Sequence, residues 1–193
     1  LLALLKTGRF DEAFDARRSI DTDDNPQLVM DLQGHLIREL TKGADDIVFR
    51  EHIFVQEEMD IAQLSHADQH ALAERFLETG FPERAEQTLS HLEEHSRQDA
   101  DRQLAARIAI ALGQPHNAQV NLLGMDDDQS RRLRADASRL AGALEDAHDL
   151  YLQTQQPETA AETAWLSEDW QGLTTAETPV FGPASQLAAY SDD

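Results

Sequence analysis

The chain has 193 residues, of which 37 are acidic and 16 are lysine or arginine, so its formal net charge is −21. A field of that sign repels a phosphate backbone, and we therefore expect neither DNA nor RNA as a partner. Cysteine is absent, which excludes disulfides, thiolate metal sites and cysteine nucleophiles. No run of about 18 apolar residues is present that could cross a membrane.

The first predicted helices lie on either side of Gly8. The apolar segment Leu1 to Lys6 is typical of the end of a helix, so we expect the sequence to be a piece of a longer protein. It has no charged leader and does not resemble a signal peptide, which leaves a cytoplasmic or a periplasmic location open. Gly8 to Ala13 predicts a turn and a second helix. An acidic linker follows, and Asn25 is the expected cap of a helix from Pro26 to Lys42.

The central stretch predicts a turn at Gly43, a helix from Ala44 to Met59, and then a pair of helices around Gly80. The pair consists of Ser65 to Thr79 and Pro82 to His95. Apolar side chains recur every three or four residues along both helices, so each helix needs neighbours to bury its stripe.

The second half of the chain repeats this pattern. Its predicted helices are Asp99 to Leu112, Asp126 to Leu140 and Pro157 to Leu166, with turns at Gly113, Gly142 and, without glycine, Glu168. Along the whole chain the predicted turns are 26 to 37 residues apart, and a period in that range is typical of stacked helical hairpins. We therefore predict an all-α, right-handed solenoid of about six antiparallel hairpins, without a sheet. It covers residues 1–173, and 174–193 form a C-terminal tail with room for a short capping helix.

The residues around these turns resemble tetratricopeptide repeats. The match is best at Leu72, Ala73, Phe76, Gly80, Ala85, Leu89 and Leu92, and it extends to Gly8, Phe10, Ala13, Gly113, Ala118, Gly142, Ala147 and Tyr151. The resemblance implies a non-catalytic interaction or scaffold module that binds a peptide or protein in a concave groove, with no cofactor and no metal. The family's partner-contact positions, carried over from the turn glycines, select His70, Glu74, Gln103, Arg107, Arg132, Asp136 and Arg139.

One helix is locally basic, with arginines at 131, 132, 134 and 139. One interpretation is internal salt bridging to Asp126 to Asp128 and to Asp136. The other is a docking point for a carboxylate, because the planar guanidinium matches it with two parallel hydrogen bonds. On that interpretation, an acidic side chain or a C-terminal carboxylate of a partner peptide meets Arg107, Arg132 or Arg139.

Two other functions remain open. His91, Glu94 and His95 match the inverted zinc motif H-x-x-E-H, and His66 and His70 add two histidines on the preceding helix, which would suit a metal-dependent hydrolase. We favour a solvated surface for these histidines, because the motif is short and lacks a cleft-forming surround. The other alternative is a structural segment of a larger envelope or secretion assembly. For Trp165 and Trp170, we expect packing between helices rather than a ligand pocket.

Overall fold

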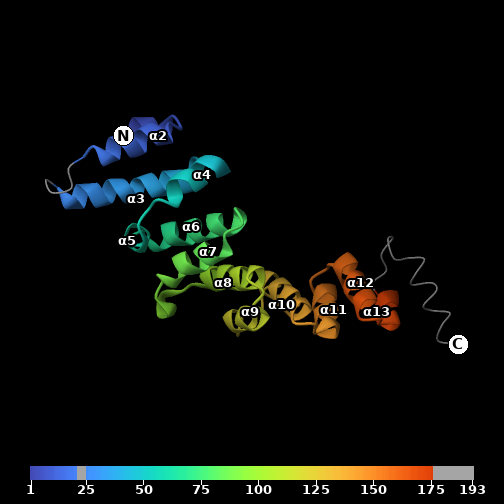
Figure 1. The fold of residues 1–193 in the computed structure, drawn as a ribbon. Helices are drawn as coiled ribbons and strands as arrows, with labels where there is room; N and C mark the ends of the chain where they lie inside the picture. The colour runs from blue at the N-terminus through green and yellow to red at the C-terminus, as the bar shows by residue number, and fades with distance from the viewer. Residues whose placement is uncertain (21–24, 176–193) are drawn as a thin grey trace. The chain divides into compact units, whose positions relative to one another are not determined.

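The computed structural model describes residues 1–20 and 25–175, without the side chains of residues 94, 174 and 175. Within these ranges the chain forms thirteen α-helices and one 3-10 turn, and no strand (Figure 1). The predicted all-α class is therefore confirmed. None of the described helices is both long enough and apolar enough to cross a bilayer.

The contacts between helices divide the chain into two compact units, an N-terminal unit, Leu1–Ser96, and a C-terminal unit, Arg97–Asp193. Helix α13, Trp170–Thr175, contains the first two residues of the predicted tail. The rest of that tail, 176–193, lies outside the described residues, as do residues 21–24 of the predicted acidic linker.

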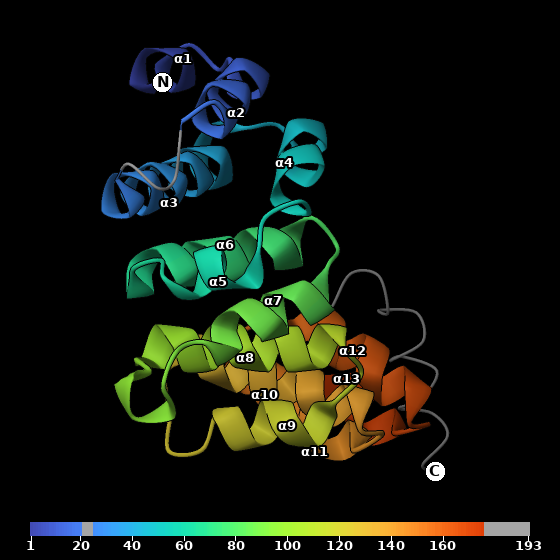
Figure 2. The ribbon, with the colours of Figure 1, turned by 60° about the vertical axis from the view of Figure 1, so that its left-hand side comes forward.

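The N-terminal unit is built around a long helix, α3, which contacts α2, α4, α5 and α6, while α1 packs on α2 and α6 packs on α7 (Figure 2). The helices are α1 Leu2–Lys6, α2 Phe10–Arg18, α3 Pro26–Gly43, α4 Asp46–Ile53, α5 Glu58–Ala62, α6 His66–Glu78 and α7 Pro82–Ser90, followed by the 3-10 turn Glu94–Ser96. The predicted cap of α3 is confirmed, because the Asn25 side chain accepts a hydrogen bond from the Leu28 amide at 3.1 Å.

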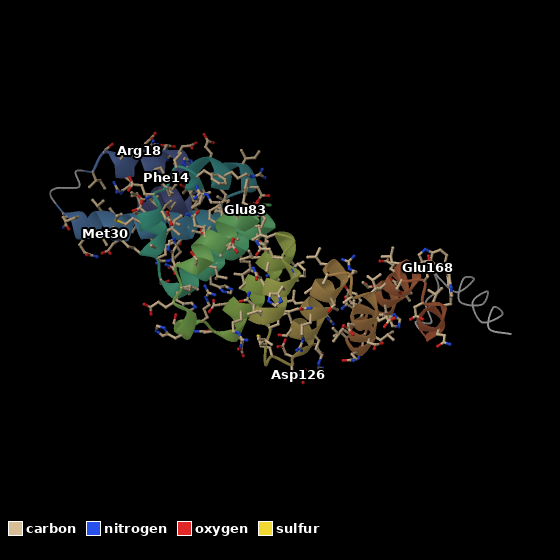
Figure 3. All side chains as sticks on the ribbon, turned by 60° about the horizontal axis from the view of Figure 1, so that its bottom comes forward. Phe14, Arg18, Met30, Glu83, Asp126 and Glu168 are labelled. Carbon is tan, nitrogen blue, oxygen red and sulfur yellow. The ribbon has the colours of Figure 1, made fainter. Side chains whose placement is uncertain are left out.

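Large side chains fill the core of the N-terminal unit. Phe76 is fully buried on α6 and packs against Phe49 of α4 and against Phe54, with ring centroids 5.5 and 6.0 Å apart. On α2, Phe14 is buried and stacks on His52 at 4.6 Å, whereas Arg18 on the same helix is exposed (Figure 3). The predicted apolar stripes therefore face the neighbouring helices.

Polar contacts between helices distant in sequence add to this core. Arg38 of α3 donates Nε–H to both carboxylate oxygens of Asp68 on α6 at 2.9 Å, and Ser65 donates its hydroxyl to the same carboxylate at 2.6 Å. Burial by itself raises the pKa of Asp68, but the hydrogen bonds from Arg38 and Ser65 outweigh it and hold that pKa below its ordinary value. His52 of α4 lies 2.7 Å from Asp11 of α2.

The C-terminal unit is a run of helices, all shorter than α3, in which each packs on the next, and α8 also contacts α10. They are α8 Asp99–Ala111, α9 Pro115–Asn121, α10 Asp128–Leu140, α11 Leu144–Gln153, α12 Pro157–Leu166 and α13 Trp170–Thr175. Its core is made mostly of alanine: Ala135, Ala147 and Ala160 surround the buried Tyr151 ring. Alanine leaves little side chain between two helices, so their backbones approach closely.

The same turn recurs at six places, of which five were predicted. At each, a residue with positive φ follows the helix, and the next residue donates its N–H to a carbonyl five positions back, as in Phe81 to Phe76 at 2.8 Å. The six residues are Gly8, Gly80, Gly113, Gly142, Gln155 and Glu168. The turns at 142, 155 and 168 are thirteen residues apart. Gln155 was not predicted, because glutamine carries no sequence signal for the left-handed conformation.

Three predicted boundaries are wrong. Gly43 is the last residue of α3 and has no positive φ; Ala44 is extended, and Asp45 caps α4 by accepting from two backbone amides at 3.0 Å. The predicted helix Ala44 to Met59 is divided between α4 and α5. Helix α7 ends at Ser90 instead of His95, since the next amides bond three residues back and tighten the chain into turns.

Candidate functional site

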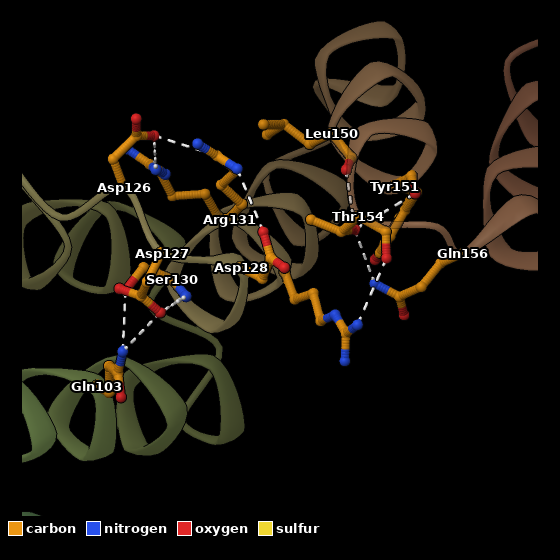
Figure 4. Close-up of polar contacts among 12 residues, drawn as sticks. Gln103, Asp126, Asp127, Asp128, Ser130, Arg131, Leu150, Tyr151, Thr154 and Gln156 are labelled. Atoms are coloured by element: carbon orange, nitrogen blue, oxygen red, sulfur yellow. Dashed lines mark hydrogen bonds and ion pairs between the residues drawn. The ribbon is translucent and has the colours of Figure 1, made fainter.

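The candidate site lies in the C-terminal unit on α10, the arginine-rich helix. Its N-cap is Asp127, which accepts from the Ser130 amide at 3.0 Å and from the Ser130 hydroxyl at 2.6 Å. Those two hydrogen bonds lower the pKa of Asp127, because they favour its charged form. Gln103 of α8 donates to both Asp127 and Ser130 at 3.0 Å (Figure 4). The predicted contact residue Gln103 therefore ties α8 to the start of α10.

Two of the four arginines on α10 form internal ion pairs. Arg131 contacts Asp126 at 3.1 Å and Asp128 at 3.2 Å, and Arg134 contacts Asp126 at 3.5 Å. The hydrogen bond from Arg131 is the main cause of the lowered pKa of Asp126, and the charge of the same guanidinium adds to it. Internal salt bridging, one of the two interpretations of this sequence, is thus confirmed for Arg131 and Arg134.

The other two arginines contact neutral oxygens of α11 and of the residue after it. Arg132 donates to the Thr154 carbonyl at 3.5 Å, and Arg139 donates Nε–H to the Tyr151 hydroxyl at 3.2 Å. Within the described part of the chain, neither guanidinium forms an ion pair with a carboxylate. Both side chains are exposed. Arg132 and Arg139 are seven residues apart, which is two turns along the same face of the helix.

Asp136 and Arg139 meet at Tyr151. The tyrosine donates its hydroxyl to Asp136 Oδ1 at 2.6 Å and accepts from Arg139. Burial of the ring, together with the hydrogen bond to Asp136, raises the pKa of Tyr151 to about 12. In the sequence, Tyr151 was only one of the residues that resemble a tetratricopeptide repeat. A buried tyrosine hydroxyl needs a polar partner, and this was the signal that could have linked it to the site.

The other predicted contact residues lie on α8 and α6. Arg107 is half-buried on α8, one turn after Gln103, and α8 packs on α10. His70 and Glu74 are half-buried on α6, one turn apart, in the N-terminal unit. The structure thus brings Asp136 and Arg139 together through Tyr151 and places Gln103 at the cap of their helix.

The inverted zinc motif does not lie on one helix, because α7 ends before it. His95 Nε2 lies 3.0 Å from Glu93, whereas His91 Nε2 lies 3.9 Å from Glu58 on α5. The side chain of Glu94, the glutamate of the motif, lies outside the described part of the structure. Among the described residues, no three histidine or carboxylate side chains are grouped as metal ligands would be.

Trp165 and Trp170 pack edge to face across α12 and α13, with ring centroids 5.6 Å apart, which is the expected contact between helices. Each nevertheless remains about half exposed, at 49% and 44%.

The chain was compared with protein-family models, with curated proteins and with solved structures, and none of the three comparisons found a match.

Proposed function

We propose that this chain is a non-catalytic interaction module that binds the carboxylate of a protein or peptide partner on the face of α10 that carries Arg132, Asp136 and Arg139. Gln103 and Arg107 extend this face onto α8, which contacts α10. The proposed scaffold is the solenoid of helical hairpins that the sequence predicts. Support for it comes from the six turns of one geometry and from the packing of successive helices.

The observation that carries the proposal is the difference between arginines on a single helix. Arg131 and Arg134 are neutralised by aspartates, whereas Arg132 and Arg139 contact only neutral oxygens in the described residues. In a chain of net charge −21, carboxylates to pair with them are abundant. The contacts with Thr154 and Tyr151 orient the two guanidiniums without cancelling their charge. Such groups bind a carboxylate strongly, because a charge-assisted, bidentate hydrogen bond forms.

The hydrogen bond with Tyr151 determines which nitrogens of Arg139 are available to a ligand. Tyr151 engages only Nε, so both terminal nitrogens of Arg139 remain without a hydrogen bond to any described residue. Asp136 accepts a hydrogen bond from the same hydroxyl and forms no ion pair with Arg139 within the described residues. A partner carboxylate thus meets a guanidinium whose side chain is already ordered, which lowers the entropic cost of binding.

The test is a pull-down with the wild type and with an Arg107→Ala/Arg132→Ala/Arg139→Ala variant whose circular dichroism remains helical. Truncation of a desolvated charged contact costs about 2–5 kcal/mol, most of it as faster dissociation. A Lys6→Ala/Arg9→Ala/Arg18→Ala variant, which removes three exposed cations from the N-terminal unit, controls for net charge. Equal partner retention by the wild type and the Arg107, Arg132 and Arg139 variant would show that the partner binds elsewhere or not at all.

The metal-dependent hydrolase has no observation in its favour, since the helix that should present His91 and His95 ends at Ser90. Metal analysis of protein purified without an affinity tag would reverse this preference if it found stoichiometric zinc that is lost in His91→Ala. No observation favours a structural segment of an envelope or secretion assembly over an interaction module.

A further inference from the structure

The opposite side of α10 borders a groove of about 480 Å³ within the C-terminal unit. It is lined by the end of α9 and the residues after it, by α11, and by Arg134 and Ser138 of α10. Positions 134 and 138 point away from positions 132, 136 and 139, because a helix turns by about 100° per residue. The groove is therefore separate from the proposed carboxylate-binding face.

The charged groups at the groove leave it negative. Asp146 and Asp149 are neighbours on one face of α11, both are exposed, and neither has an ion pair or side-chain hydrogen bond with any described residue. The cation of the lining, Arg134, is paired with Asp126, which lies outside the lining. Two carboxylates three residues apart repel each other, and a cation placed between them relieves that repulsion.

The apolar part of the groove lies beside these carboxylates. Leu122 is fully buried beneath it, Leu150 is half-buried, and Leu123 is 67% exposed. A side chain that covers Leu123 and the exposed part of Leu150 removes apolar surface from water, which favours binding. The volume is within the range of ordinary ligand sites and suits one long side chain with an apolar neighbour.

We propose that this groove binds a segment of a partner protein in which an arginine or lysine is flanked by leucine-like residues. The cation meets Asp146 and Asp149, while the apolar neighbour lies on Leu123 and the exposed part of Leu150. Charge complementarity favours such a partner over a second copy of this chain, because two copies of net charge −21 repel each other. The site adds a second specificity, of opposite charge, to the module.

The experiment is an NMR titration of the full chain, labelled with ¹⁵N, with the acetylated and amidated peptide Gly-Leu-Arg-Arg-Leu-Gly. Peptides with glutamine or glutamate in place of both arginines are the matched probes. We expect saturable shifts of the backbone amides of Leu122, Leu123 and Leu150 with the arginine peptide, weaker binding of the glutamine peptide, and none of the glutamate peptide.

Two double variants distinguish specific binding in the groove from general electrostatic attraction to an acidic chain. In Asp146→Asn/Asp149→Asn the dissociation constant of the arginine peptide should rise about tenfold, as expected for loss of a charge-assisted contact. Glu158→Gln/Glu162→Gln makes the same change in charge on α12, outside the groove, and should leave it unchanged. Equal weakening in both variants would overturn the proposal. So would an absence of shifts in the groove, or shifts that depend on protein concentration without peptide, since the latter identify a second copy as the occupant.

Discussion

The two units of this chain fill their interiors in different ways. The N-terminal unit uses large rings, with Phe49, Phe54 and Phe76 in contact, and adds polar contacts such as Arg38 with Asp68. The C-terminal unit uses mostly alanine at its helix contacts and contains four of the six left-handed turns. Rings fill the space between helices that lie further apart, whereas alanine requires helices to be close. Loss of a large ring should therefore be costly in the first unit, and added volume should be costly at the alanine contacts of the second.

The largest expected effect is in the aromatic core. Phe76→Ala should destabilise the protein by about 3–5 kcal/mol, because it removes a fully buried ring and leaves a cavity beside Phe49 and Phe54. Urea denaturation followed by circular dichroism measures this loss. Trp165→Ala, at a half-exposed ring in the C-terminal unit, is the control and should cost less. Equal costs would mean that the buried Phe76 ring contributes no more to stability than a half-exposed ring.

The reciprocal change adds volume to the alanine core. Ala147→Leu should destabilise the protein by about 1–3 kcal/mol, because Ala147 is fully buried among Ala135, Tyr151 and Ala160. Ala111→Leu makes the same substitution at an exposed position of α8 and should have little effect in the same urea titration. An Ala147→Leu variant as stable as the wild type would mean that these helices are not in close contact.

A smaller effect tests the polar contact of the N-terminal unit. Asp68→Asn should cost about 1–2 kcal/mol at neutral pH, because it weakens charge-assisted hydrogen bonds from Arg38 and Ser65. The folded-state pKa of Asp68 is lowered, so its contribution is present above the ordinary value of 3.8 and is lost as the pH falls through the folded-state pKa. Wild type and variant should therefore converge in acid. Glu83→Gln, at an exposed position of α7, should show no such convergence. A difference in stability between wild type and Asp68→Asn that persists in acid would contradict the assignment.

The smallest effect tests the turns. Gln155 and Glu168 have φ of 57° and 58°, a conformation that costs an L-residue about 1 kcal/mol or more. Replacing either by glycine should raise the melting temperature, with a net gain of about 0.5 kcal/mol after the added chain entropy of the unfolded state. Gly142→Ala should lower the melting temperature by about as much as the glycine replacements raise it. Calorimetry of the three variants measures whether the melting temperature rises or falls. A lower melting temperature for Gln155→Gly would argue against the left-handed turn.

Local signals in the sequence predicted the local parts of the fold. Asn25 before Pro26 predicted a cap, and glycine before a new apolar stripe predicted the turns at 80, 113 and 142. Gly43 carried the same signal, but Asp45 capped a new helix before a left-handed residue was needed. Gln155 adopts the turn because α11 and α12, the helices on either side of it, pack on each other. Glutamine itself has no property that predicts a left-handed turn.

The contacts of the candidate site likewise divide into those that the sequence predicted and those that it did not. The ion pairs of Arg131 with Asp126 and Asp128 follow from spacing along one short segment, so the sequence was sufficient to expect them. The contact of Arg139 with Tyr151 depends on how α11 packs against α10, and Gln103 reaches Asp127 only because α8 packs against the same helix. Contacts of that kind depend on tertiary packing that a single sequence does not reveal.

The buried phenol of Tyr151 also allows unfolding of the C-terminal unit to be followed by absorbance. An unfolded tyrosine ionises near pH 10, whereas in the folded chain its pKa is about 12, so its stabilising contribution is complete below the first value and is lost as the pH rises through the second. The chain has two tyrosines, and Tyr190→Phe leaves Tyr151 alone. After a jump to a pH between those values, the rise in phenolate absorbance then follows the separation of α10 and α11, without any attached dye.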